Sequence, residues 1–234
     1  MAKIDQKRFL ERTLSYLGDP KQEGALALSD EIMGCLAELE EEAEFRGCYE
    51  RYPIDFDEGG YPGIGELGLS FHSEDLKRLF AGRTEVLVIA STLGVAYERY
   101  SKRVQSHNLS HAVVLDAASS AYLEGMTDLF EEELGLGERT FRFAPGYGDL
   151  DLALNAPLMR GIRADKRIGL TVGPSGLFLP QKSMLALIGL GGEARLSGAS
   201  AGAKEPGAGD FCAGGARRGA CGKGGGSAKC FLPG

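Results

Sequence analysis

The segment Thr84–Ala90, with the sequence Thr-Glu-Val-Leu-Val-Ile-Ala, constrains the fold of this chain most strongly. A short apolar run of this kind, rich in β-branched residues, is typical of a strand buried within a sheet. Other segments with strand-like patterns lie on both sides of it in the sequence. They are residues 48–54, 65–71, 138–143, 168–172 and 183–190.

Apolar residues at helical spacing predict several helices between these strands. The first spans residues 4–17 and ends at Gly18. The other predicted helices are residues 29–47 with Ser29 as the cap, 74–81 with Ser73, 95–107, 110–134 with Ser110, and a helix from Asp149 or Asp151 to Arg160. Because helices and strands occur in blocks, an α+β fold fits better than a strictly alternating βαβ fold.

Residues 191–234 differ sharply from the rest of the chain. Fourteen of these 44 residues are glycine, and the apolar periodicity stops. Such a stretch buries too little apolar surface to offset the entropic cost of ordering it, so we expect a disordered tail. We therefore divide the chain into an α+β domain at residues 1–190, helical up to about residue 47, and a glycine-rich tail at residues 191–234.

Charge and hydropathy exclude two classes of partner. The formal net charge is −7, and residues from Glu193 onward hold six basic and three acidic side chains, which leaves −10 for the body. An acidic body argues against nucleic acid as a partner, because phosphate binding needs a basic face. No apolar run approaches the roughly 18 residues of a membrane span. The N-terminus also lacks an apolar export segment, so we expect a cytoplasmic protein.

The segment Thr140–Asp149, with the sequence Thr-Phe-Arg-Phe-Ala-Pro-Gly-Tyr-Gly-Asp, is the most informative for function. Arg142 stands at the end of a predicted strand, and its guanidinium can pair with a carboxylate at about 1.5–3 kcal/mol per charge-assisted hydrogen bond. Pro145 and Gly146 force a turn that exposes backbone groups able to read an adenine edge. Tyr147 adds a flat face and a hydroxyl. These features suit an amino-acid-bearing nucleotide, and the residues alone leave open an ordinary strand-to-turn junction.

Residues 142–149, followed by the segment Ile168–Leu190, resemble the activation domain of cobalamin-dependent methionine synthase. They resemble still more closely the short free-standing proteins related to that domain. The helical segment Leu115–Glu124 and the strand end Ala90–Gly94 fit these proteins as well, so that the resemblance covers roughly residues 45–190. It implies a twisted antiparallel sheet with flanking helices.

The resemblance also implies a binding site for S-adenosylmethionine on that sheet. Arg142 matches the family arginine that holds the ligand carboxylate, and Glu124 matches a glutamate that can pair with the ligand ammonium. Ala144 matches a backbone contact, and Gly146 and Tyr147 match the family's Gly-Tyr pair. The resemblance assigns no catalytic side chain and no metal ligand to this chain.

Phe178 is the point at which this sequence departs from the family pattern. It stands where the family has a tyrosine, so an aromatic face remains and the hydroxyl is lost. An acidic ligand contact near the family's N-terminus has no counterpart that we can place.

The function that the resemblance implies is the reactivation of cobalamin. The family presents the methyl group of S-adenosylmethionine to a cobalamin held by a partner. With one electron from a flavodoxin-type donor, this restores methylcobalamin from the oxidised Co(II) state. We expect an accessory methyltransferase component that acts on a cobalamin-binding methionine synthase. The alternative is a non-catalytic interaction module for another corrinoid-dependent methyltransferase system, which the lost hydroxyl at Phe178 and the altered tail favour slightly.

Three other signals are weaker. The string Gly63–Gly68 matches a dinucleotide-binding pattern but lacks the strand before it and the helix after it. His107 and His111 have the i, i+4 spacing of zinc ligands, yet the residues between them indicate a helix break. The tail cysteines Cys212, Cys221 and Cys230 are widely spaced among glycines, which makes a poor preformed metal site.

Overall fold

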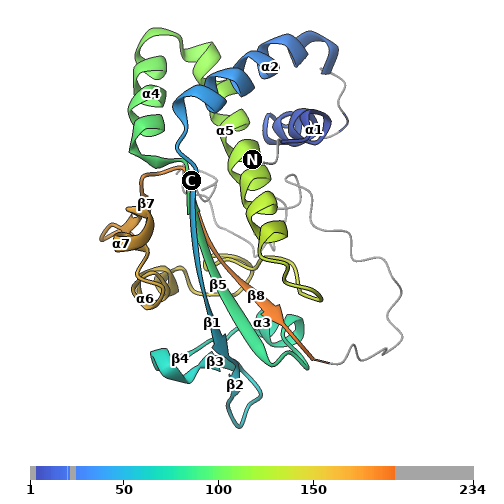
Figure 1. The fold of residues 1–234 in the computed structure, drawn as a ribbon, viewed down its shortest axis with the longest axis vertical. Helices are drawn as coiled ribbons and strands as arrows, with labels where there is room; N and C mark the ends of the chain where they lie inside the picture. Colours follow the sequence, from blue (N-terminus) through green and yellow to red (C-terminus); the bar gives the residue numbers. More distant parts are fainter. Residues whose placement is uncertain (1–3, 20, 22–24, 193–234) are drawn as a thin grey trace, which may run out of the picture.

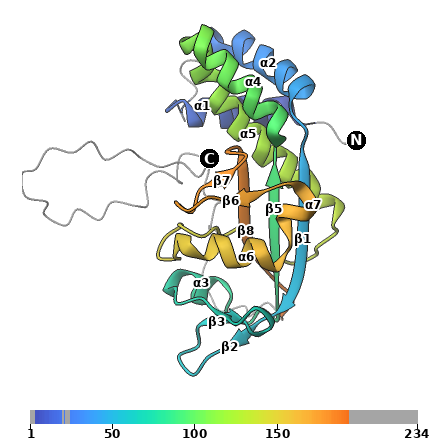
Figure 2. The same cartoon turned by 90° about the vertical axis from the view of Figure 1, so that its left-hand side faces the viewer.

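The computed structural model describes residues 4–19, 21 and 25–192, and it confirms the α+β fold. Figure 1 shows the longer helices gathered at one end of the molecule and an antiparallel sheet of long strands that runs away from them. Figure 2 shows that shorter helices and strands lie against one side of this sheet.

The main sheet is built from strands far apart in the sequence. Its order is β1 (Arg46–Pro53), β5 (Glu85–Thr92) and β8 (Ser183–Leu190), and both pairings are antiparallel. The apolar run predicted as a buried strand is the central strand β5, so that prediction is confirmed. Its side chains alternate between two apolar clusters, with Val86 and Val88 on one face and Leu87 and Ile89 on the other. Both faces are covered, which explains why the run is apolar throughout.

Two smaller sheets flank the main one. One pairs β2 (Asp55–Phe56), β3 (Pro62–Ile64) and β4 (Leu69–Ser70), and the other pairs β6 (Thr171–Val172) with β7 (Phe178–Leu179). The predicted continuous strand at residues 65–71 is wrong, because a 3-10 turn η1 (Gly65–Leu67) precedes β4 and ends at Gly68 with φ of 63°. The predicted strand at residues 168–172 is present only at Thr171–Val172, because a short helix α7 (Ala164–Ile168) extends to its first residue and ends at Gly169 with φ of 72°.

Four helices form the helical end: α1 (Gln6–Tyr16), α2 (Ala25–Glu42), α4 (Gly94–His107) and α5 (Leu109–Glu133). The other three pack against α5, and their buried side chains, among them Phe9, Leu14, Ile32 and Tyr97, form one apolar cluster. The predictions for α1 and α4 are confirmed within a few residues.

Two helix boundaries differ from prediction. Helix α2 begins before Ser29 and ends at Glu42, so Ser29 is not its cap, and residues 46–47 belong to strand β1 instead of the helix. Carboxylates at the end of α2 oppose the helix dipole there, and strand β1 starts soon afterwards. Asn108 caps α5 in place of Ser110, because its side-chain oxygen accepts a hydrogen bond from the backbone N–H of His111 at 3.1 Å.

Three short helical segments complete the fold: α3 (Glu74–Leu79), a 3-10 turn η2 (Leu152–Leu154) and α6 (Asn155–Gly161). Ser73 caps α3, accepting from the N–H of Leu76 at 2.9 Å, and Asp151 caps η2, accepting from Ala153 at 2.9 Å. Ser73 was predicted as a cap, and Asp151 was one of two predicted caps for a single helix to Arg160, which is divided into η2 and α6. Helices α6 and α7 contribute Leu158, Ile168 and other apolar side chains to the cluster that covers one face of the main sheet.

The C-terminal end of α5 covers the opposite face of the sheet. Phe130 packs there with Tyr49, at 6.1 Å between ring centroids, and with Phe45 at 6.3 Å. Gly47 of β1 leaves room for this ring, since a Cβ at that position would lie 2.6 Å from Phe130 Cε1. The predicted tail and its three cysteines lie outside the described residues from position 193 onward. Within the described ranges, no helix is long and apolar enough to cross a membrane.

Candidate functional site

Arg142 lies on a segment that is held along strand β8 without forming a regular strand. Backbone hydrogen bonds join Thr140 to Gly189 at 3.0 Å and Phe143 to Leu187 at 2.9 and 2.8 Å. The hydroxyl of Thr140 accepts a further bond from the N–H of Gly189 at 2.9 Å. The predicted strand at residues 138–143 is therefore reduced to two isolated bridges. These bonds on either side of Arg142 fix its backbone.

The guanidinium of Arg142 pairs with two carboxylates of α5. Its Nη2 lies 2.8 Å from Asp128 Oδ1 and its Nη1 lies 3.0 Å from Glu131 Oε1. The Arg142 side chain is only 18% exposed, so these contacts are largely shielded from water. Arg139 contacts the second oxygen of Glu131 at 3.4 Å. Arg142 is thus a nearly buried cation whose charge is already compensated within the protein.

Glu124 lies one helical turn before Asp128, and helix α1 contacts both. The hydroxyl of Tyr16 donates to Glu124 Oε1, and Arg12 Nε lies 3.6 Å from Glu124 Oε2. Arg12 Nη2 also lies 2.8 Å from Asp128 Oδ2. Glu124 and Arg142 therefore belong to one set of linked charges. We call it the charge network, and it consists of Arg12, Tyr16, Glu124, Asp128, Glu131 and Arg142.

The charge network sets the protonation of its members. Burial lowers the pKa of Arg142, but the carboxylates of Glu131, Asp128 and Glu124 outweigh that effect, and the net pKa is raised. Burial raises the pKa of Glu131, and Arg142 and Arg139 oppose the rise only in part. Burial, reinforced by Glu124, raises the pKa of Tyr16, so its hydroxyl stays neutral and acts as a donor. The guanidinium of Arg142 is charged at every physiological pH.

The chain turns sharply after Phe143. Tyr147 N–H donates to the carbonyl of Ala144 at 3.0 Å, and Gly146 N–H donates to that of Leu150 at 2.8 Å. Gly146 has φ of 88°, a left-handed backbone conformation that residues other than glycine rarely adopt. A Cβ there would also lie 3.0 Å from Leu152 Cδ1. The Pro-Gly turn predicted from the sequence is present, and it needs this glycine for two reasons.

The aromatic side chains of the predicted site lie next to this turn. The ring of Tyr147 meets that of Phe143 edge to face at 5.9 Å and is half-buried. Phe178, on β7, is 6% exposed and belongs to the same apolar cluster as Phe143 and Tyr147. Leu152 lies between the turn at Gly146 and the loop at Gly176. A Cβ added at Gly146 would lie 3.0 Å from its Cδ1, and a Cβ added at Gly176 would lie 3.6 Å from its Cδ2. Phe178 is therefore held mainly as a core side chain.

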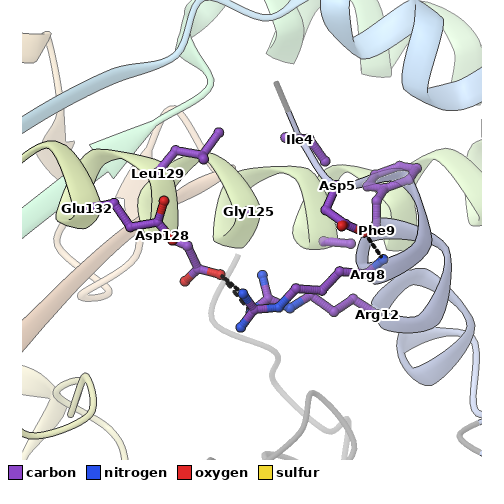
Figure 3. A pocket seen from close by; sticks show the side chains of 10 residues that line it. Ile4, Asp5, Arg8, Phe9, Arg12, Gly125, Asp128, Leu129 and Glu132 are labelled. Carbon is purple, nitrogen blue, oxygen red and sulfur yellow. Dashed lines mark hydrogen bonds and ion pairs between the residues drawn. The ribbon is translucent and has the colours of Figure 1, made fainter. Parts of the chain in front are cut away.

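A cavity of about 200 Å³ lies between α1 and α5 beside the charge network (Figure 3). Arg8 and Arg12 reach across from α1 toward Asp128, as the dashed lines in Figure 3 mark. Asp5 and Glu132 also line the cavity, and its remaining walls are apolar.

The sequence reasoning placed Arg142 and Glu124 but missed their partners Arg12, Tyr16, Asp128 and Glu131. A signal for the acidic members was present, since Glu124, Asp128 and Glu131 recur at the spacing of one helix face. Arg8 and Arg12 have the same spacing on α1. What the sequence did not reveal is that these two faces meet, because that depends on how α1 packs.

The alternative sites do not form in the described part of the chain. No group of three or more His, Cys, Asp or Glu side chains there is arranged to hold a metal ion. His111 lies 3.0 Å from Glu38 and 3.4 Å from Glu31 of α2, while His107 contacts the carbonyl of Arg103 on its own helix. The string Gly63–Gly68 covers the end of β3 and the turn η1.

Comparison with known proteins supports the fold. No protein-family model and no curated protein matches this chain. The structure is similar to a crystal structure of the MetH reactivation domain bound to AdoHcy, with a TM-score of 0.61, over 81% of this chain and 76% of that chain. The two sequences are 12% identical. The resemblance inferred from the residues is therefore confirmed at the level of the fold.

Proposed function

We propose that this chain binds S-adenosylmethionine and is an accessory methyltransferase component for the reductive methylation of cobalamin on a methionine synthase. One observation supports this most: Arg142 and Glu124 belong to one charge network, linked through Asp128 and Arg12, in a fold similar to one that holds AdoHcy. An amino-acid end needs a cation and an anion at fixed separation, and an adenosine needs exposed backbone and an aromatic face.

In this proposal each predicted site residue has a distinct role. Arg142 holds the ligand carboxylate and Glu124 the ammonium, while the backbone of Ala144 and Gly146 contacts the adenosine. The half-buried ring of Tyr147 supplies the aromatic face. Phe178 is 6% exposed, so we expect it to support this face from within the core and to contact the ligand at most through its edge.

The chemistry asks little of these side chains beyond position. A sulfonium methyl group is already a good electrophile, so the protein accelerates transfer by orienting it and by excluding water. The cobalamin, carried by a partner protein in the cytoplasm, would supply the cobalt that receives the methyl group. A flavodoxin-type donor would supply the electron.

Titration calorimetry with S-adenosylmethionine and with AdoHcy tests the proposal directly. We expect saturable heat from both ligands, and their absence in a protein shown by circular dichroism to be folded would overturn the proposal. The variant Arg142→Lys keeps the charge but loses the two-pronged geometry, so its affinity should fall about tenfold. Arg83→Lys is the matched control, because Arg83 is similarly shielded at 19% exposure and pairs with Glu138.

One observation favours a second function. Both terminal nitrogens of Arg142 already have carboxylate partners, which suits a non-catalytic interaction module of another corrinoid-dependent methyltransferase system. Such a module would bind cobalamin-loaded partner proteins in a pull-down while giving no heat with S-adenosylmethionine. The calorimetry and the pull-down together separate the two functions.

A further inference from the structure

Helix α1 brings its own polar groups to the carboxylates that the proposed ligand would use. Tyr16 donates to Glu124, and Arg12 contacts Glu124 at 3.6 Å and Asp128 at 2.8 Å. Arg12 is 17% exposed and Glu124 is 18% exposed, so this contact is shielded from water. The ammonium group of a ligand would therefore have to compete with the guanidinium of Arg12 for the Glu124 carboxylate.

The charge network contains stand-ins for both ends of an amino acid. Arg12 is a cation placed against Glu124, where the ligand ammonium is expected. The carboxylates of Asp128 and Glu131 are anions placed against Arg142, where the ligand carboxylate is expected. Asp128 joins the two halves, because its two oxygens face Arg12 and Arg142. Moving Arg12 therefore changes the charge balance at Arg142 as well.

The packing of α1 limits which parts of it can move. Phe9, Thr13 and Leu14 are at most 2% exposed, and the two apolar side chains belong to the helical core, so the helix itself is firmly held. Arg12 has a long flexible side chain at the edge of the cavity between α1 and α5 (Figure 3). Asp5 and Glu132 line the same cavity and offer the guanidinium alternative carboxylates.

We propose that Arg12 and Tyr16 form an intramolecular competitor for the amino-acid end of S-adenosylmethionine. Ligand binding displaces them from Glu124 and Asp128, and Arg12 turns into the cavity toward Asp5 and Glu132. This inference rests on the proposed function and adds a built-in control of affinity to it. Only those molecules in which Arg12 and Tyr16 have already left Glu124 can then bind the ligand. The measured dissociation constant therefore equals the intrinsic dissociation constant divided by the fraction of such molecules.

The variants Arg12→Gln and Tyr16→Phe test the competitor by calorimetry. Each removes one contact to Glu124, so each should bind AdoHcy about fivefold or more tightly than the parent protein, the lower end of typical coupling between sites. AdoHcy is the better probe, because it is a zwitterion without net charge and is less sensitive than the sulfonium ligand to the loss of a distant positive charge. Arg12→Lys keeps the cation and should stay close to the parent affinity.

Lys7→Gln is the matched control on the same helix. It removes the same charge from α1, but Lys7 is 86% exposed and its ion pair is with Glu11 one turn away. Its affinity should be unchanged. Tighter binding by Lys7→Gln of the same size would overturn the competitor, since the effect would then be one of overall charge.

The outcomes distinguish this inference from the proposed function. Equal or weaker binding by Arg12→Gln and Tyr16→Phe, with the parent protein binding normally, overturns the competitor alone. No binding by any protein overturns the proposed function and the competitor with it. Should Arg12→Gln fail to fold, the arginine Nε–H resonances of the parent protein give the answer, with Arg12 assigned by Arg12→Lys. Its resonance should shift when AdoHcy is added, and an unmoved resonance at saturation overturns the competitor.

Discussion

Charged groups hold both ends of helix α5, and the two ends use different chemistry. At the N-terminal end, His111 lies between Glu31 and Glu38 of α2, and Tyr100 of α4 donates to Glu38 at 2.6 Å. At the C-terminal end, the charge network joins α5 to α1 and to the segment that carries Arg142. One end depends on a histidine and the other on arginines.

The two ends also differ in burial. The side chain of Glu131 is 8% exposed and that of Arg142 is 18% exposed, whereas Glu38 and Glu31 are 31% and 41% exposed. A broken pair in the first group leaves a charge in a poorly solvated place, while water can replace a partner in the second. The C-terminal end should therefore dominate stability, and the N-terminal end should respond to pH near neutrality.

The largest effect is expected from Arg142→Met. Removing this cation leaves Glu131 and Asp128 with one partner fewer, and we expect a loss of about 3 kcal/mol in the free energy of unfolding. Urea denaturation measures it. Arg83→Met, at a similarly shielded but more solvated pair, should lose clearly less. A loss below about 1 kcal/mol for Arg142→Met would mean that the buried network is no stronger than a surface pair.

A smaller effect is expected from Glu131→Gln. The amide keeps the shape and one acceptor, and Arg142 keeps Asp128, so we expect the free energy of unfolding to fall by about 1–2 kcal/mol. Glu133→Gln, two residues along on the exposed side of α5, serves as the control and should change little. Equal losses from the two variants would remove the distinction between buried and exposed carboxylates on this helix.

The smallest effect is expected at His111. Burial lowers the pKa of His111, but hydrogen bonds and charge from Glu38 and Glu31 outweigh it and raise the pKa above its usual value. A histidine whose pKa is raised on folding stabilises the folded state. This contribution is complete at pH values below the pKa in the unfolded state, about 6.5, and is lost as pH rises through the pKa in the folded state. The stability difference between the parent protein and His111→Gln should be below about 1 kcal/mol at pH 6.

Urea denaturation from pH 5.5 to about 8.5 checks this sign. The difference between parent and His111→Gln should shrink as pH rises. The difference between parent and Arg142→Met should not shrink, because Arg142 stays charged in this range and its loss raises the pKa of Glu131 further, which costs the variant stability as pH rises. A difference at His111 that grows with pH would show that Glu31 and Glu38 do not favour its charged form.

The sequence predicted those features whose cause is local. Strand β5 was identifiable because its apolar run needs cover on both faces, and Ser73 and Asp151 were identifiable as caps because their side chains bond within three residues. The strand predicted at residues 138–143 does not form, because the hydroxyl of Thr140 accepts the hydrogen bond from the N–H of Gly189. In a regular strand the backbone carbonyl of Thr140 would accept that bond. Nothing in the local pattern reveals that exchange.

The candidate site divides in the same way. The Pro145–Gly146 turn follows from local chemistry, and the resemblance pointed to Arg142 and Glu124, whose ligand contacts remain a prediction. That Arg142 pairs with Asp128 depends on how the segment along β8 packs against α5, and that Glu124 pairs with Tyr16 depends on how α1 packs against α5. These pairs join residues far apart in the chain, and the periodicity of apolar residues does not predict such contacts.

The glycine at position 47 has a consequence for which substitutions this chain tolerates. Strand β1 accepts the ring of Phe130 against its backbone at Gly47, where a Cβ would lie 2.6 Å from that ring. Phe130 stands between Asp128 and Glu131 on α5. The contact of its ring with the backbone at Gly47 therefore determines how closely this part of the helix approaches the sheet. Even alanine at position 47 would require the Phe130 ring to move, and we expect this to disturb how the two carboxylates meet Arg142. We therefore expect a half-exposed strand position without any functional group of its own to tolerate few substitutions.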